Sequence, residues 1–221
     1  MPTGDPTARV FIWYPVIEEG GRENIGHASM YIGNFVVADV FEQSLNDDDG
    51  GVIPSALQDD PGQAGTHHND NYVSWWPTGH PGLYEVLFET QSAKPKLRFY
   101  NDVLEEGEEP HLVYDVYGLN VGAMKARWQE IRNKPGATYR WIRESCATMV
   151  MAVLEAGGAL SKLNAMNYLW YGSRLYWTPK RVAMVCSRLR DMDLAVKTKA
   201  GHCPKKQEGL LGAFLSVTGL R

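Results

Sequence analysis

The run RESCATMVMAVLEAGG, residues 143–158, predicts a helix with two defined ends. Ser145 is a typical N-cap residue, and the pair Gly157-Gly158 is a typical helix stop. Cys146 therefore lies at the helix N-terminus, where unsatisfied amides and the helix dipole stabilise a thiolate. The stretch predicts a helix that presents a nucleophilic cysteine. The alternative is an ordinary small residue buried in a helix.

Elsewhere in the chain, apolar runs and alternating patterns predict strands. Apolar residues spaced three or four positions apart, preceded by an N-cap residue, predict further helices. The predicted strands cover residues 8–15, 27–33, 34–41, 72–77, 82–89 and 111–116. We expect the 27–33 strand to be half-buried. The other predicted helices cover 121–132, capped by Asn120, and the segment after Thr178 and Pro179. The expected fold class is α+β, with an antiparallel sheet packed against helices.

Length and composition favour a single domain over residues 1–221. The segment 42–71 shifts to Asp, Gly, Pro, Asn and Gln and predicts a surface insertion, and a tail begins at residue 197. The basic patch of that tail is followed by an apolar end, for which a docked helix is the preferred interpretation.

The charge pattern and hydropathy exclude several classes of protein. The net charge of −4 gives no reason to expect a nucleic-acid partner. No apolar run approaches the roughly 20 residues that span a bilayer, and the first residues lack the features of a secretory signal. We therefore expect a product made in the cytoplasm, without a membrane span.

The cysteines and histidines suggest thiol chemistry rather than a metal site. Three cysteines (146, 186 and 203) are too few for a disulfide framework, and free thiols are preferred to a pairing of Cys186 with Cys203. A thiolate needs an imidazole nearby, and His27 is the best placed of six histidines because it opens a strand after a glycine. A surface histidine is the alternative. The other five histidines are expected to be solvated: His67, His68, His80, His111 and His202. A metal site at His67 and His68 is not favoured.

A third group usually orients the catalytic imidazole, and here the sequence leaves two candidates. Ser74 in YVSWWP is preferred to Asp39 in VVADVF, because the aromatic neighbours of Ser74 would form the wall of a groove. The backbone amide of Cys146 is the expected oxyanion donor, with Tyr139 as a possible helper.

The segments GHASMYIG, YVSWWP, YGLNVGAMKARW, ESCATMVMAVLEAGG and YWTPKRV, taken together, resemble a permuted papain-like cysteine hydrolase of the NlpC type. In that family the histidine strand precedes the cysteine helix, reversing the order of papain. The resemblance extends to hydrolase effectors of type VI secretion, of the TseH kind. It implies His27 as base and Cys146 as nucleophile, no cofactor, and a papain-like fold.

The resemblance also implies a function and a place of action. We expect a cysteine hydrolase that cleaves an amide bond of peptidoglycan in the periplasm of a target cell, with an immunity protein as a possible partner. The alternatives are a protease, deamidase or acyltransferase acting on a host protein, and a non-catalytic binding module with the same fold.

Overall fold

The structure is a computed structural model, and it describes most of the chain between residues 2 and 204. The described residues are 2–17, 23–24, 26–33, 69–78, 89–96, 99–140, 143–172 and 176–204. Asp39, His67, His68 and His80 lie outside them, as do the predicted strands 34–41 and 82–88, nearly all of the predicted insertion, and the tail beyond residue 204.

The centre of the molecule is a five-stranded antiparallel sheet with the order β10-β8-β1-β4-β5. Its strands are β1 (Ala8–Trp13), β4 (His27–Ile32), β5 (Tyr72–Val73), β8 (Leu112–Val116) and β10 (Ala195–Lys199). Four of these lie within predicted strands (8–15, 27–33, 72–77 and 111–116), whereas β10 overlaps the start of the segment interpreted as a tail from residue 197. The α+β class with an antiparallel sheet is confirmed.

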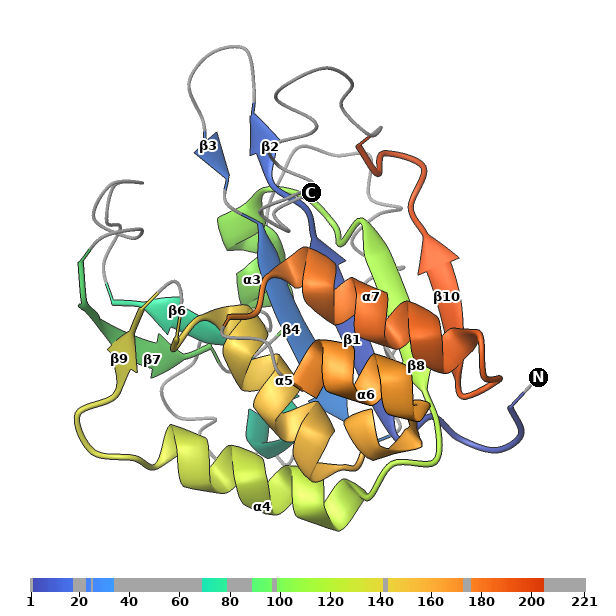
Figure 1. Cartoon of the computed structure of the whole chain (residues 1–221). Helices are drawn as coiled ribbons and strands as arrows, with labels where there is room; N and C mark the ends of the chain where they lie inside the picture. The colour runs from blue at the N-terminus through green and yellow to red at the C-terminus, as the bar shows by residue number, and fades with distance from the viewer. Residues whose placement is uncertain are drawn as a thin grey trace.

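Four helices lie on the side of this sheet that faces the viewer in Figure 1, or below its end. They are α4 (Val121–Arg132), α5 (Cys146–Ala156), α6 (Ala165–Gly172) and α7 (Pro179–Arg190). The three predicted caps are confirmed: Asn120, Ser145 and Thr178 accept hydrogen bonds from the backbone N–H groups of Ala123, Thr148 and Arg181.

The sheet separates two cores, so β4 is buried on both faces. Val10 and Ile12 belong to the core shared with α5 and α7. Phe11 and Trp13 alternate to the other face, where Phe99 of α3 (Phe99–Glu106) lies 4.4 Å from the Phe11 ring, measured between centroids. The expectation of a half-buried strand at 27–33 is therefore wrong, because the sequence-based prediction did not include α3.

A smaller sheet lies at the left of Figure 1, with the order β6-β7-β9. Its strands are β6 (Trp75–Pro77), β7 (Gln91–Pro95) and β9 (Thr138–Tyr139). The predicted strand 72–77 is thus divided at Ser74, where the chain leaves the large sheet for the small one. The remaining elements are short: β2 (Val16–Ile17), β3 (Glu23–Asn24), η3 (Asn69–Asn71) and η4 (Leu160–Lys162).

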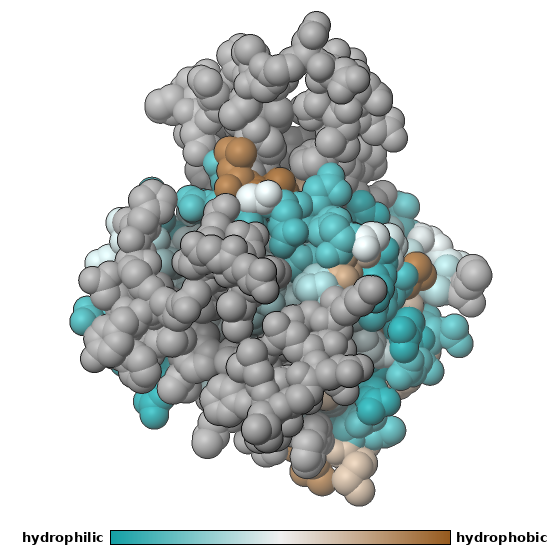
Figure 2. All heavy atoms as spheres, turned by 90° about the horizontal axis from the view of Figure 1, so that it is seen from above, coloured by the Kyte–Doolittle hydropathy of each residue, from teal (hydrophilic) through white to brown (hydrophobic). Residues whose placement is uncertain are grey.

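The described surface is mainly hydrophilic when it is seen from above. Figure 2 shows apolar residues in small separate groups between hydrophilic ones on this face. Scattered apolar side chains of this kind are normal for a globular protein. Within the described part of the chain, no helix has the length and hydropathy needed to cross a bilayer.

Gly26, the residue before His27, occupies a position that no other residue fits well. Its φ is +77°, and a Cβ there would lie 2.7 Å from the Trp13 carbonyl oxygen and 2.8 Å from the Pro15 nitrogen. We predict that Gly26→Ala lowers the free energy of unfolding by about 2 kcal/mol or more, measured by urea denaturation.

Gly33 provides the matched control for this prediction. Its φ is +95°, but an added Cβ would meet nothing within 4 Å, so Gly33→Ala tests the backbone strain alone. We expect Gly33→Ala to cost about 1 kcal/mol. Equal losses for the two variants would contradict the steric argument.

Candidate active site

Cys146 is the first residue of α5 and lies directly after the N-cap Ser145. Its side chain is 4% exposed. The Ser145 hydroxyl accepts from the backbone N–H of Thr148 and leaves the amide of Cys146 itself uncapped by that side chain. The sulfur is therefore placed beside backbone donors at the positive end of the helix dipole.

His27, the first residue of β4, brings its imidazole to this cysteine. The charge of Cys146 and a hydrogen-bond interaction with it both act to raise the pKa of His27, so the imidazole and the thiol lie within interaction distance. The Nε2 atom of His27 lies 3.1 Å from Oδ2 of Asp102, and both side chains are buried. Because Nε2 faces the carboxylate, Nδ1 is the nitrogen left for the sulfur. The arrangement is cysteine, imidazole and carboxylate in series.

Asp102 of α3 accepts hydrogen bonds from four side chains while fully buried. Besides His27, Ser74 donates to Oδ1 at 2.7 Å and Trp76 donates to the same oxygen at 2.8 Å. Tyr72 donates to Oδ2 through a short hydrogen bond. A buried carboxylate is stable only when it is compensated in this way, so the network holds Asp102 in its charged form.

Aromatic rings fix the plane of the His27 imidazole. The Trp76 ring stacks on it with centroids 4.4 Å apart and an interplanar angle of 25°. Trp13 lies at 5.7 Å and is tilted by 50°. The imidazole is thus held by packing as well as by its hydrogen bonds, and few orientations other than the observed one are open to it.

The charges of the site shift two pKa values in opposite directions. Burial alone would lower the pKa of His27, but the charges and hydrogen bonds of Asp102 and Cys146 outweigh it and raise the pKa well above 6.5. Burial alone would raise the pKa of Asp102, but His27 and the hydrogen bonds from Tyr72 and Ser74 lower it. At neutral pH the site therefore favours an imidazolium beside a carboxylate.

Tyr139 of β9 also contacts the cysteine. Burial raises the pKa of its hydroxyl well above 10, and the charge of Cys146 and a side-chain hydrogen bond to it act in the same direction. The hydroxyl therefore stays protonated and can donate. Its place beside the sulfur agrees with the expected position of an oxyanion helper.

The structure brings together the three site residues predicted from the sequence. Cys146 and His27 interact closely enough for the cysteine to raise the pKa of the imidazole, and the Ser74 hydroxyl lies 3.3 Å from His27 Nε2. Ser74, however, also bonds Asp102, and the carboxylate is the group that pairs with the imidazole. Asp102 was missed, and Asp39 lies outside the described residues.

The signal that could have found Asp102 is the pattern of RFYNDVLEEG. Phe99, Asp102, Val103 and Glu106 recur at spacings of three and four and share one helical face. That face carries two acidic residues, and the segment was not among the helices predicted from the sequence.

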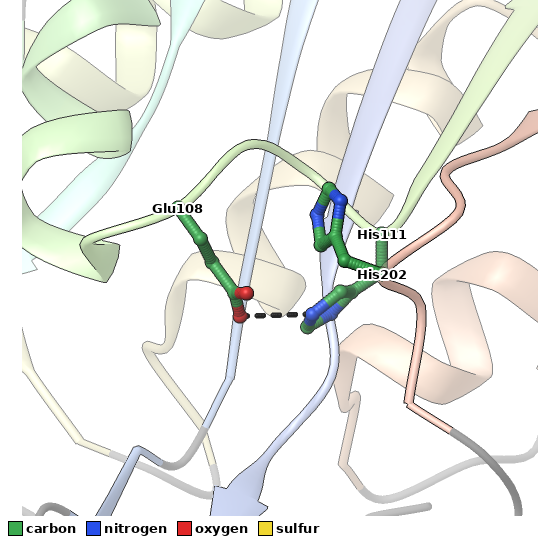
Figure 3. A group of neighbouring side chains, drawn as sticks. All are labelled: Glu108, His111 and His202. Atoms are coloured by element: carbon green, nitrogen blue, oxygen red, sulfur yellow. Dashed lines mark ion pairs between the residues drawn. The ribbon is translucent and has the colours of Figure 1, made fainter.

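One group of side chains in the described ranges has the composition of a metal site. Ligand atoms of Glu108, His111 and His202 lie within 4.8 Å of one another, and Figure 3 shows the Glu108 carboxylate directed at an imidazole. His111 is 1% exposed, so the expectation that it is solvated is wrong, whereas His202 is exposed.

The hydrogen bonds of His111 argue against metal binding at this group. Its Nδ1 accepts from the backbone N–H of Tyr14 at 2.7 Å, so the ring proton sits on Nε2, 2.8 Å from Glu108 Oε1. A metal on Nε2 would have to displace that proton from a neutral ring. The group instead ties the end of α3 to the strands, since His202 Nε2 also bonds the Glu109 carbonyl at 3.0 Å.

The other two cysteines have no such surroundings. All three thiols are free, as expected from the sequence. Cys186 is fully buried in α7, and burial raises the pKa of its thiol to about 12. Cys186 is therefore a core residue without nucleophilic character.

Comparison with known proteins gives one family and two toxins. The model of the family described as IcsB middle domain matches residues 86–208, more than half of the chain. This region contains Asp102, Tyr139 and Cys146 and begins after His27.

The chain is also 34% identical, over 82 residues, to proteins named multifunctional-autoprocessing repeats-in-toxin from Vibrio cholerae serotype O1 and from Vibrio vulnificus. These matches cover 37% of this chain and 2% of each toxin. No solved structure matches the chain. The toxin relatives agree with the expected effector character, whereas the permuted papain-like arrangement stays a prediction.

Proposed function

Since this chain belongs to the IcsB middle domain family and is similar to bacterial toxins, we propose that it is an effector enzyme whose Cys146 thiol carries acyl groups. The observation that carries this proposal is the buried series Cys146, His27 and Asp102. These are the nucleophile, the base and the orienting carboxylate of thiol catalysis, and they come from three separate elements.

The first chemical step follows from the geometry. The Cys146 thiolate attacks the carbonyl carbon of an acyl donor, and the oxyanion receives hydrogen bonds from the Cys146 amide and Tyr139. The C–S bond forms, the bond to the leaving group breaks, and the His27 imidazolium gives its proton to that group. The product is a thioester on Cys146.

The second step passes the acyl group to an acceptor nucleophile. His27, now neutral, takes a proton from the acceptor as it attacks the thioester, and the thiolate leaves. We propose an amine of a protein as the acceptor, because the side chains of Cys146 and His27 are only 4% and 2% exposed. A thioester shielded from bulk water persists until a bound acceptor reaches it.

The proposed target is a protein of the cell that receives the effector. The name of the toxin relatives describes processing of their own chain, a reaction on a polypeptide. Peptidoglycan hydrolysis by a papain-like hydrolase, as the sequence resemblance implies, shares the first step. It differs in using water as acceptor and a cell-wall amide as donor.

Intact-mass spectrometry tests the thioester. We predict that the protein, incubated with acyl thioesters of increasing chain length, gains the mass of one acyl group that neutral hydroxylamine removes. Cys146→Ala should gain none, whereas Cys203→Ala, which removes a different thiol, should gain it as the unaltered chain does. Acylation that persists in Cys146→Ala would contradict the proposal.

The acceptor is tested with the acyl-enzyme. We expect acyl groups to appear on lysine side chains of added host-cell protein, identified by peptide mass spectrometry. Release of free acid alone, with no modified protein, would overturn transfer and leave a hydrolase. Release of muropeptides from purified sacculi would favour the peptidoglycan reaction instead.

A further inference from the structure

A pocket lies next to the candidate active site, on the far side of β9. It has a volume of about 320 Å³ and is formed by α4, β9 and the first turns of α5. In Figure 1, α4 lies at the bottom of the molecule, β9 at the left and α5 near the centre. The volume lies at the small end of the range of known ligand pockets.

The side chains that line this pocket include more positive charges than their ion pairs neutralise. Arg127, Lys134 and Arg143 line it together with Glu130 and Glu144. Both carboxylates have cationic partners: Glu130 lies 2.7 Å from Arg127, and Glu144, which also accepts from Thr138, lies 3.8 Å from Arg140, a residue outside the lining. Within the described ranges, no ion pair involves Lys134 or Arg143, so two positive charges remain unmatched.

The pocket wall is apolar where α4 and α5 meet. Ile131, Met149 and Ala152 contribute apolar surface, and Trp75 also lines the pocket. A ligand that fits both parts carries a negative group and an apolar portion. The two unmatched cations suit a phosphate monoester, which has a charge of about −1.5 to −2 at neutral pH.

The wall of the pocket is also part of the scaffold of the active site. The Trp75 indole donates to the Thr138 carbonyl at 3.2 Å, and the next residue, Tyr139, contacts Cys146. Thr148, another lining residue, bonds the Ser145 hydroxyl at 3.1 Å. A ligand here therefore contacts the two segments that position Cys146.

We propose that this pocket binds a phosphate-bearing ligand, with the phosphate at Lys134 and Arg143 and an apolar portion against Ile131 and Met149. The proposal does not rest on the acyl chemistry of Cys146. Its test measures binding alone, so either proposal can fail while the other stands.

Calorimetric titration with inorganic phosphate and with phenyl phosphate tests the site. We expect phenyl phosphate to bind more tightly, because its ring reaches the apolar wall. The double variant Lys134→Ala/Arg143→Ala should weaken binding at least about tenfold, and added salt should weaken it in the unaltered chain. Both side chains are exposed, so the fold should tolerate the change. Lys162→Ala, an exposed cation outside the pocket, is the matched control.

Vesicles distinguish a free phosphate ester from a lipid headgroup. Binding of phenyl phosphate that depends on Lys134 and Arg143 supports a soluble ligand. A lipid headgroup is supported if the protein binds only phosphatidic acid vesicles and not phosphatidylcholine vesicles. This binding should also depend on Lys134 and Arg143. Absence of binding to every probe, or binding that the double variant leaves unchanged, overturns the proposal.

Discussion

Replacing Cys146 with alanine is expected to abolish turnover, with a loss of at least about 10⁴-fold in the rate of product formation. The thiol is the nucleophile in the first proposed step and the leaving group in the second, and neither remaining cysteine can replace it. Cys186 is fully buried and the pKa of its thiol is raised to about 12. Cys203 lies after β10, and its thiol donates to the Pro204 carbonyl oxygen. His27→Ala should give a comparable loss, since it removes the proton acceptor.

Stability measurements separate this effect from misfolding. Sulfur makes a small contribution to the core, so we expect the melting temperature of Cys146→Ala to stay within a few degrees of the unaltered value. Cys203→Ala should keep full activity. Retention of activity by Cys146→Ala, measured by the modification of target protein, would exclude the thiol mechanism altogether.

The meeting of Cys146 and His27 could be predicted because each residue carries a local signal. Ser145 and the glycine pair define the helix ends, and Gly26 with the alternation of β4 defines the strand. Residues 119 positions apart could then be paired on chemical grounds, since a thiolate needs a cation.

Asp102 could not be predicted with the same rules. It lies on the buried face of a short helix, where hydrophobic patterning expects an apolar residue. Its charge is tolerated only through partners from other segments, Tyr72, Ser74 and Trp76, and sequence order does not reveal that they meet. The division of the predicted strand at Ser74 has the same origin, because turning there carries Trp76 over the imidazole.

Asp102→Ala is expected to lower both stability and activity, because it removes the acceptor of four side-chain donors, three of them buried. Breaking a buried ion pair by removing one partner costs about 3–5 kcal/mol. Asp115→Ala provides the control, since Asp115 pairs with Arg9 at a position where both side chains are partly exposed. We expect the control to cost about 1 kcal/mol or less. Urea denaturation of the two variants measures the difference.

The pH dependence of this difference follows from the two shifted pKa values. The pKa of Asp102 is lowered, so its contribution to stability is present above the unfolded value of about 3.9 and is lost as the pH falls through the folded pKa. The pKa of His27 is raised, so its contribution is complete below about 6.5 and is lost as the pH rises through the folded pKa. The stability lost in Asp102→Ala should therefore be largest between about pH 4 and 6.5.

A milder substitution separates charge from structure. Asp102→Asn keeps the size of the side chain and one acceptor oxygen but removes the charge that raises the pKa of His27. Burial, which lowers that pKa, is then opposed by Cys146 alone, so the imidazolium beside Cys146 is less favoured than in the unaltered chain. We expect alkylation of Cys146 by iodoacetamide at pH 6 to slow by about tenfold or more in Asp102→Asn, while Asp115→Asn reacts at the unaltered rate. An unchanged rate in Asp102→Asn would mean that the carboxylate supports the fold and not the nucleophile.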